Sequence, residues 1–262
     1  MNIEHSFKKK YGQNFLHDEN IIKKIISTAK ANVDKNSLII EVGPGSGMLT
    51  KELDKIGKVI AYEIDTELED NLYSLNLKNT TIIFSDFLKR DIKEDIKTIE
   101  HNKLYVIANL PYYITTPIVT KLIEEEIDID KIVIMVQKEV GDRFCALPKT
   151  RNYGSITVFL NYYFNIKKEF IVSRNCFTPK PNVDSIIISL TKKENRRIAN
   201  NQETFFTLIR ESFKYKRKNI RNNLKNYDLN KIEETLKKHK MDLNTRAEEI
   251  PLDVFIDISN NL

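Results

Sequence analysis

The sequence predicts an α/β protein in which a doubly wound sheet is followed by a small all-helical domain. Short apolar runs of strand length alternate with segments of helical periodicity. A glycine-rich turn at 43–47 follows the first apolar run and opens a helix. Beyond a polar linker at 192–202 the strand-like runs stop and only amphipathic segments remain. We therefore expect one domain over residues 1–191 and a second over residues 192–262.

Composition limits the class of protein. The chain has 262 residues, 41% of them hydrophobic and 30% charged, which is enough for one sizeable domain and a smaller one. No apolar run approaches the ~20 residues that span a bilayer, and residues 1–10 contain no apolar segment of a secretory signal. Cys145 and Cys176 stand apart, and the four histidines are scattered. We expect reduced thiols in a cytoplasmic protein, with no metal site and no membrane association.

Five apolar runs predict the parallel part of the sheet. They cover 37–42, 58–65, 80–84, 104–108 and 131–137.

Helices are expected between and after these runs. Asp18 precedes a helix with apolar residues at helical spacing, Pro117 sits in the first turn of another, and 138–144 continues as a third. Periodicity leaves 155–164 open between helix and strand. The runs at 167–172 and 183–190 predict a closing hairpin.

The C-terminal part predicts helices with one basic face. Residues 230–240 form a further helix, and Pro251 opens the last one. Residues 204–224 carry a row of cations beside an apolar stripe of Phe206, Ile209, Phe213, Ile220 and Leu224. The net charge of +5 is modest, and a solvated helix face explains these cations as well as a polyanion-binding face does. The candidate polyanion-binding residues are Arg210, Lys214, Arg217, Lys218 and Arg221, with Lys8, Lys9 and Lys10 near the N-terminus.

The glycine-rich turn and an acid predict a nucleoside site. Gly43, Gly45 and Gly47 have the spacing G-x-G-x-G, which departs from the G-x-G-x-x-G of dinucleotide sites and suits a ligand without a pyrophosphate. Glu63 ends the second strand, twenty residues after Gly43, where a carboxylate accepts both ribose hydroxyls. The alternatives are a turn without a ligand and a surface acid.

Polar and aromatic residues also follow the third and fourth strands. Asp86 accepts hydrogen bonds from an exocyclic amine, and Phe87 stacks on a ring. Asn109, Leu110, Pro111 and Tyr112 follow the fourth strand, where ligands bind in open α/β sheets. An amide beside Pro-Tyr suits a flat, amino-bearing ring held from its edge and its face.

This arrangement suits methyl transfer to an adenine amine, whose lone pair is delocalised into the ring. Hydrogen bonds from its two N–H groups to the Asn109 side-chain oxygen and the Leu110 carbonyl favour a pyramidal, nucleophilic nitrogen. Stacking on Tyr112 contributes about 1–3 kcal/mol, and alignment of nitrogen and methyl up to about 7–11 kcal/mol. A paired adenine has to flip out first. Phe177, in a loop stiffened by two prolines, is either packed or functional.

Five segments together resemble the bacterial small-subunit rRNA adenine dimethyltransferases. NLPY is shared by many amino-methyltransferases, whereas the combination is specific to this family. Shorter matches occur at 153–155, 183–185, 212–213, 217–218 and 222–224, so the resemblance covers nearly the whole chain in order. The five segments are GQNFL at 12–16, EVGPGSG at 41–47, NLPY at 109–112, QKEV at 137–140 and FTPKP at 177–181.

The resemblance implies a class I S-adenosylmethionine-dependent methyltransferase, Rossmann-like with a seven-stranded, mostly parallel sheet, and a C-terminal rRNA-binding domain. The implied substrate is a pair of adjacent adenosines in the 3′-terminal hairpin of 16S rRNA in the 30S precursor, each dimethylated at N6. The implied product of the cofactor is S-adenosyl-L-homocysteine, and we expect a monomer. The implied cofactor site comprises Asn14, Leu16, Gly43, Gly45, Gly47, Glu63, Ile64, Asp86, Phe87 and Asn109. The base would be held by Asn109, Leu110, Pro111, Tyr112 and Phe177. Tyr113 stands where the family often has Asn, and Asn161 where it often has Gln.

Three alternatives stay open at this point. The 23S rRNA adenine methyltransferases share the chemistry, but Gly12, Leu110 and Pro117 favour the 16S enzymes. A nicotinamide oxidoreductase fits the glycine turn and Glu63 but explains neither 109–112 nor the basic segment. A non-catalytic assembly factor would bind the ribosomal subunit through its basic face, and both roles can coexist.

Overall fold

The computed structural model describes residues 13–30 and 33–262, and these form two compact units. The first contains the residues up to 141 together with 167–191, and the second contains 142–166 together with 192–262. One division between the units falls between residues 191 and 192, and the expected two-domain assignment stays a prediction. Residues 142–166 were expected in the first domain, yet they pack with the second unit, because Tyr153, Val158 and Tyr162 lie in the same apolar core as Phe205 and Phe255.

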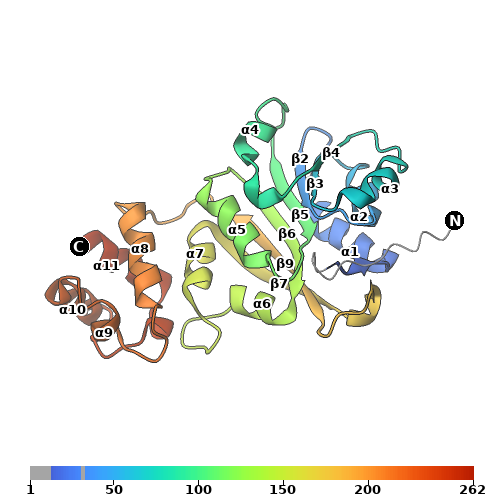
Figure 1. The fold of residues 1–262 in the computed structure, drawn as a ribbon. Helices are drawn as coiled ribbons and strands as arrows, with labels where there is room; N and C mark the ends of the chain where they lie inside the picture. The colour runs from blue at the N-terminus through green and yellow to red at the C-terminus, as the bar shows by residue number, and fades with distance from the viewer. Residues whose placement is uncertain (1–12, 31–32) are drawn as a thin grey trace. The chain divides into compact units, whose positions relative to one another are not determined.

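A seven-stranded sheet is the centre of the first unit (Figure 1). The strand order is β4-β3-β2-β5-β6-β9-β7. The four pairs from β4 to β6 are parallel, and β9 runs antiparallel to β6 over seven residue pairs. The seven-stranded, mostly parallel sheet is therefore confirmed. Its strands are β2 Leu38–Val42, β3 Lys58–Glu63, β4 Thr80–Phe84, β5 Leu104–Asn109, β6 Lys131–Gln137, β7 Phe164–Val172 and β9 Ser185–Lys192.

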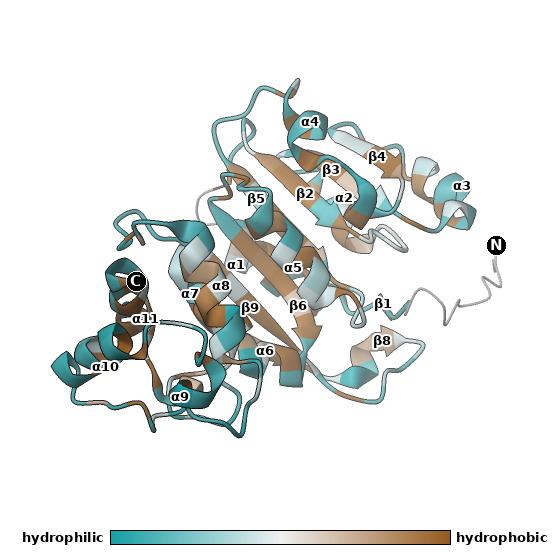
Figure 2. Ribbon diagram, turned by 60° about the vertical axis from the view of Figure 1, so that its left-hand side comes forward, coloured by the Kyte–Doolittle hydropathy of each residue, from teal (hydrophilic) through white to brown (hydrophobic). Residues whose placement is uncertain are grey.

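The central strands form because their apolar runs are buried on both faces. All five residues of β2 are buried, as are the five middle residues of β6. Strands covered on both faces carry continuous apolar runs instead of alternating patterns. Figure 2 shows this as brown along β2, β5 and β6.

The helices of the first unit begin where the sequence indicates. Asp18 accepts hydrogen bonds from the N–H groups of Asn20 (2.9 Å) and Ile21 (3.2 Å) at the start of α1, as expected of a capping residue. Two five-residue helices, α3 and α4, were not predicted because one turn shows no periodicity. The helices are α1 Glu19–Lys30, α2 Met48–Leu53, α3 Glu69–Tyr73, α4 Ile92–Ile96 and α5 Thr115–Glu124, and α6 Lys138–Phe144 begins in this unit and ends in the second.

A second, two-stranded sheet joins distant parts of the chain. β1 Phe15–Leu16 pairs antiparallel with β8 Phe177–Thr178, so that Leu16 lies opposite Phe177. The N–H of His17 also donates to the carbonyl of Cys176 (3.1 Å). Strands of two residues leave no sequence pattern, and this pairing was not predicted.

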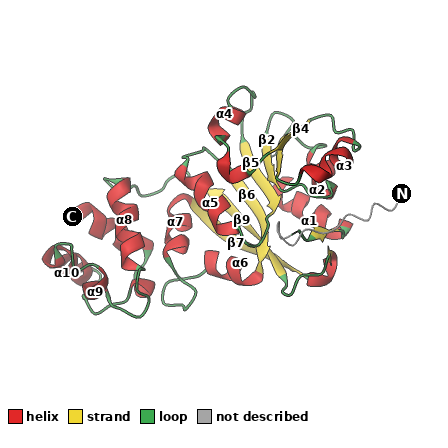
Figure 3. Ribbon diagram, in the orientation of Figure 1, coloured by secondary structure: helices red, strands yellow, loops and turns green. Residues whose placement is uncertain are grey.

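The second unit contains the remaining helices (Figure 3). The ambiguous segment at 155–164 forms a helix, α7, followed directly by β7. No helix in the described ranges is long and apolar enough to cross a membrane. The helices of this unit are α7 Ser155–Tyr163, α8 Gln202–Ser212, α9 Ile220–Asn223, α10 Leu229–Lys238 and α11 Leu252–Asn261.

The segment at 204–224 is not one helix. α8 ends at Ser212, whose carbonyl accepts a hydrogen bond from the Asn223 amide (2.8 Å). Asn219 then caps α9 through the N–H of Asn222 (3.1 Å). The buried stripe of α8 contains Phe205, Leu208 and Ile209, whereas Phe206 and Phe213 of the expected stripe are only partly buried.

Candidate functional site

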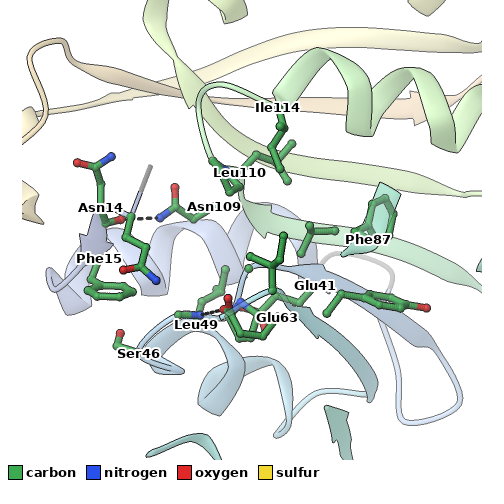
Figure 4. Close-up of a pocket in the computed structure, with 18 of the residues that line it drawn as sticks. Asn14, Phe15, Glu41, Ser46, Leu49, Glu63, Phe87, Asn109, Leu110 and Ile114 are labelled. Atoms are coloured by element: carbon green, nitrogen blue, oxygen red, sulfur yellow. Dashed lines mark hydrogen bonds between the residues drawn. The ribbon is translucent and has the colours of Figure 1, made fainter. Parts of the chain in front are cut away.

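A pocket lies at the carboxyl ends of β2, β3, β4 and β5, the edge where parallel sheets bind ligands (Figure 4). Most residues expected around a cofactor or a base come together there. Gly47 and Phe177 do not line it. The expected residues that do are Asn14, Leu16, Gly43, Gly45, Glu63, Ile64, Asp86, Phe87, Asn109, Leu110, Pro111 and Tyr112.

The turn after β2 depends on glycine at two points. Gly45 has φ +57°, and a Cβ there would lie 2.7 Å from the Phe15 ring, so only glycine lets that ring close over the turn. Gly47 has φ +76°, and its Cβ would lie 2.3 Å from Leu75. Gly47 therefore shapes the start of α2 from outside the pocket.

Glu63 is fixed at the end of β3 by two backbone donors. Its carboxylate accepts hydrogen bonds from the N–H groups of Gly45 (3.0 Å) and Asp65 (2.9 Å). The side chain is buried, and burial raises its pKa, opposed by those two hydrogen bonds. The carboxylate that was expected to hold a ribose is thus oriented and faces the pocket.

Glu41 is a second buried carboxyl in the pocket wall. Burial raises its pKa to about 8, and the neighbouring Glu63 contributes in the same direction. One of its oxygens has no hydrogen-bond partner among the described residues. With Asp86, three carboxyl groups line this pocket, and none of its described lining residues is Lys, Arg or His. Since Glu41 is mostly protonated at neutral pH, the lining is set apart by its lack of basic side chains, which disfavours an anionic ligand.

Asn109 is held in one orientation by the N-terminal segment. Its side-chain Nδ2 donates to the main-chain carbonyl of Asn14 (3.3 Å), as Figure 4 shows. Its Oδ1 accepts no hydrogen bond from the described part of the chain. The following N–H, of Leu110, donates to the carbonyl of Met135 (3.1 Å). The amide therefore presents an acceptor toward the pocket.

The two aromatic residues expected to hold the base, Tyr112 and Phe177, lie in different surroundings. Tyr112 lines the pocket, and its hydroxyl is hydrogen-bonded to Ser185 Oγ (2.6 Å). Phe177 is buried in the core of the first unit, within β8. Stacking of a base between these rings stays a prediction.

The structure adds pocket residues that sequence reasoning left out. The Gln13 side chain donates to Asp65 (2.7 Å), which is itself buried, and Phe15 packs against Gly45. Glu41 appeared in the sequence only as the residue ahead of the glycine turn. The GQNFL segment was the available signal for Gln13 and Phe15, and only through the family resemblance.

The expected RNA-binding residues of the second unit are exposed but are spread over α8, α9 and the segment between them. The side-chain amide of Asn223 holds that segment, 213–219, by hydrogen bonds. The amide donates to the carbonyls of Tyr215 and Lys218 (3.3 Å each) and accepts from the N–H of Tyr215 (3.2 Å). Lys8, Lys9 and Lys10 lie outside the described residues. The exposed cations are Arg210, Lys214, Arg217, Lys218 and Arg221.

A mostly parallel seven-stranded sheet with β9 reversed between β6 and β7, and a glycine-lined pocket at its carboxyl edge, defines a class I methyltransferase fold. The model of the ribosomal RNA adenine dimethylase family matches residues 4–262. The chain belongs to this family.

Individual relatives and solved structures are consistent with this family assignment. The ribosomal RNA small subunit methyltransferase A of Clostridioides difficile (strain 630) is 43% identical over 264 residues, covering 97% of this chain and 90% of that protein. The crystal structure of a dimethyladenosine transferase from Plasmodium falciparum has a TM-score of 0.75 at 26% identity, over 93% of this chain and 95% of that one. The structure of the 23S rRNA methyltransferase ErmE has a TM-score of 0.73 at 24% identity, over 95% and 99%, and shows the common fold.

Proposed function

We propose that the protein transfers methyl groups from S-adenosylmethionine to the N6 amines of two adjacent adenosines in the 3′-terminal hairpin of 16S rRNA, within the small ribosomal subunit. The single observation that carries the proposal is the orientation of Asn109. Its amide nitrogen is used by Asn14, so its oxygen remains to accept a hydrogen bond from an amine at the pocket.

The charge of the pocket supports S-adenosylmethionine over a nicotinamide dinucleotide. The N–H of Gly45, which would face a pyrophosphate, already donates to Glu63. Glu63 and Asp86 line the pocket with no described basic residue beside them, and this lining disfavours an anionic ligand more than a cationic one. Glu63 would hold the ribose hydroxyls, and Asp86 and Phe87 the adenine. When bound, S-adenosylmethionine supplies an electrophilic methyl group on a sulfonium.

The residues after β5 would then prepare the target amine. Asn109 Oδ1 accepts one N6–H and the Leu110 carbonyl accepts the other, which localises the nitrogen lone pair away from the ring. Tyr112 stacks on the base, a contact worth about 1–3 kcal/mol in single-strand binding. No side chain has to remove the proton, because the methylated nitrogen is acidic enough to release it to water.

The relatives favour the small subunit as the substrate. The 43% identical protein is named a small subunit methyltransferase, whereas the likeness to the 23S enzyme supports the fold alone. A role in assembly through binding is compatible with catalysis.

The test is methylation of small subunits that lack the modification. We expect mass spectrometry of the 3′-terminal 16S rRNA fragment to show two dimethylated adenosines after incubation with S-adenosylmethionine. Asn109→Ala should lower turnover by about 10²–10³, as does loss of one oriented hydrogen-bonding group in other transfer enzymes. The control is Asn230→Ala, an exposed residue of α10. Methylation of naked 23S rRNA only, or wild-type turnover by Asn109→Ala, would contradict the proposal.

A further inference from the structure

The hydroxyl of Tyr112 is anchored to a strand that lies two positions away in the sheet. Its oxygen is 2.6 Å from Ser185 Oγ. Asn109, the last residue of β5, lies opposite Met135 on β6, and Ser185 lies opposite Gln137, the last residue of β6. Tyr112 therefore reaches over the end of β6 to the first residue of β9.

The reversed direction of β9 makes this contact possible. The parallel strands end at the pocket edge, whereas β9 begins there, so Ser185 stands at the level of the residues that follow β5. Two inter-strand steps amount to about 10 Å, a distance that a tyrosine side chain and three residues of loop cover.

Ser185 is a rigid anchor. It is fully buried, and seven successive pairs fix the register of β9 on β6. The preceding residue, Asp184, is held on both sides: its carbonyl accepts from the N–H of Lys138 (3.0 Å), and its Oδ1 accepts from the N–H of Arg174 (2.9 Å). Functional groups supported by strands are placed more accurately than groups supported by loops alone.

Tyr112 needs such an anchor. It follows β5 by three residues and precedes α5, so no ladder hydrogen bond fixes its backbone. A hydroxyl bond at the far end of the ring restrains both side-chain torsions and hence the plane of the ring. Burial raises the pKa of the phenol, which therefore remains a hydrogen-bonding hydroxyl at neutral pH.

We propose that Ser185 is a positioning residue for methyl transfer, which holds the Tyr112 ring in the plane where it stacks on the target adenine. The inference rests on the proposed function and extends it to a residue outside the pocket lining. Ser185 acts only through Tyr112 and touches neither base nor cofactor.

The alternative is that the bond serves only stability, and the chain offers a matched control. Ser189 is also in β9, is buried, and its Oγ donates to Glu169 at the same distance, 2.6 Å. Ser189→Ala removes one buried hydroxyl bond from the same strand without touching Tyr112.

The experiment compares Ser185→Ala, Tyr112→Phe, the double variant and Ser189→Ala in the methylation assay on small subunits. We expect Ser185→Ala and Tyr112→Phe each to lower kcat by about three- to ten-fold, the size of one lost hydrogen bond. The KM values for S-adenosylmethionine and for the subunit should change little, since phosphate contacts dominate affinity for RNA. The double variant should lose no more than the single ones, because both remove the same bond. Ser189→Ala should lower the melting temperature yet keep wild-type kcat.

Two results would overturn the anchor while leaving the proposed function intact: wild-type kcat for Ser185→Ala, or losses in the double variant that multiply. If Ser189→Ala lost as much kcat as Ser185→Ala, the Tyr112–Ser185 hydrogen bond would have only a structural role, and the proposal would be wrong. An inactive wild-type protein contradicts the proposed function and this inference with it.

Discussion

Glu41 and Glu63 show how single residues set the character of the pocket. Both are buried, and the pKa of each is raised, first by burial. They differ in hydrogen bonding: Glu63 accepts from two main-chain N–H groups, whereas one Glu41 oxygen has no described partner. Glu63 is therefore preorganised to accept from a ligand, and Glu41 makes the folded protein sensitive to pH.

Glu41→Gln tests this sensitivity. With a pKa of about 8 in the folded protein and 4.5 as its ordinary value, the folded state binds a proton that the unfolded state releases. The free energy of unfolding therefore declines as pH rises from about 4.5 to about 8, and the glutamine variant lacks this decline. We expect similar melting temperatures at pH 5 and, at pH 8, a higher one for the variant by at least about 2–4 °C.

Thermal melts without S-adenosylmethionine measure this effect. Glu69→Gln, an exposed carboxyl in α3, controls for the loss of one negative charge. A difference between wild type and Glu41→Gln that stays constant from pH 5 to pH 8 would refute the assignment.

Without the family resemblance, pocket residues were predictable only at strand ends and in the turns that follow them. Glu63 and Asn109 end apolar runs, and the sheet rule places such residues at one edge. Glu41 lies inside an apolar run, and its chemical setting depends on tertiary packing. The role of Ser185 could not be predicted for a related reason. Its hydrogen-bond partner, Tyr112, is 73 positions away in the sequence, and a single serine in a strand-like run gives no sign of such a contact.

At the scale of elements, α6 packs on β9 through a glycine. A Cβ at Gly141 would lie 2.3 Å from Cγ2 of Ile186, the residue that follows Ser185 in β9. Any side chain at position 141 therefore forces α6 or the Ile186 side chain to shift. The contact thus supports the strand that anchors Tyr112.

Gly141→Ala should therefore destabilise the protein, although alanine is the better helix former. Overpacking costs about 1–3 kcal/mol, against about 1 kcal/mol gained in helix propensity. We expect a lower melting temperature and a reduced midpoint of unfolding in urea. Gly154→Ala is the control, because nothing lies within 4 Å of its Cβ position and its φ of −159° suits alanine. Equal stability of the two variants would show that α6 shifts at no cost.

The elements that sequence reasoning missed are the short ones. Strands and helices with long apolar or periodic runs were found, but α3, α4 and the β1–β8 pair have too few residues for a pattern. The prediction of one continuous helix over 204–224 was wrong for another reason. Its helical spacing continues through 213–219, whereas the amide of Asn223 and the cap at Asn219 stop it locally.

At the scale of the whole molecule, charged side chains are distributed differently in the two units. The first unit holds a pocket whose described lining contains carboxyl groups and no basic side chain. The second unit exposes cations around a segment that Asn223 keeps ordered, with Tyr215 57% exposed among them. A net charge of +5 conceals this division. An aromatic ring interleaved with cations is typical of surfaces that bind unpaired nucleotides.

Charge reversal distinguishes a local RNA contact from a general attraction. Arg217, Lys218 and Arg221 are exposed and form no ion pair within the described part of the chain. Reversing all three to Glu should weaken binding to the small subunit at least about ten-fold and flatten the log–log salt dependence by about 2–3 units, if each neutralises one phosphate. Affinity for S-adenosylmethionine should not change.

The matched control reverses Lys231, Lys237 and Lys238, exposed residues of α10 in the same unit, to Glu. Both triple variants have the same net charge and therefore lose the same long-range attraction. Lys237 and Lys238 form helix ion pairs with Glu233 (3.6 Å) and Glu234 (3.0 Å), so thermal melts first establish that the α10 variant is folded, and a local contact then accounts for the remaining difference. Filter binding across a salt series measures both slopes. If the α10 variant loses as much affinity and slope as the first, the cations around 217–221 contribute only to the overall field, and the rRNA contact lies elsewhere on the protein.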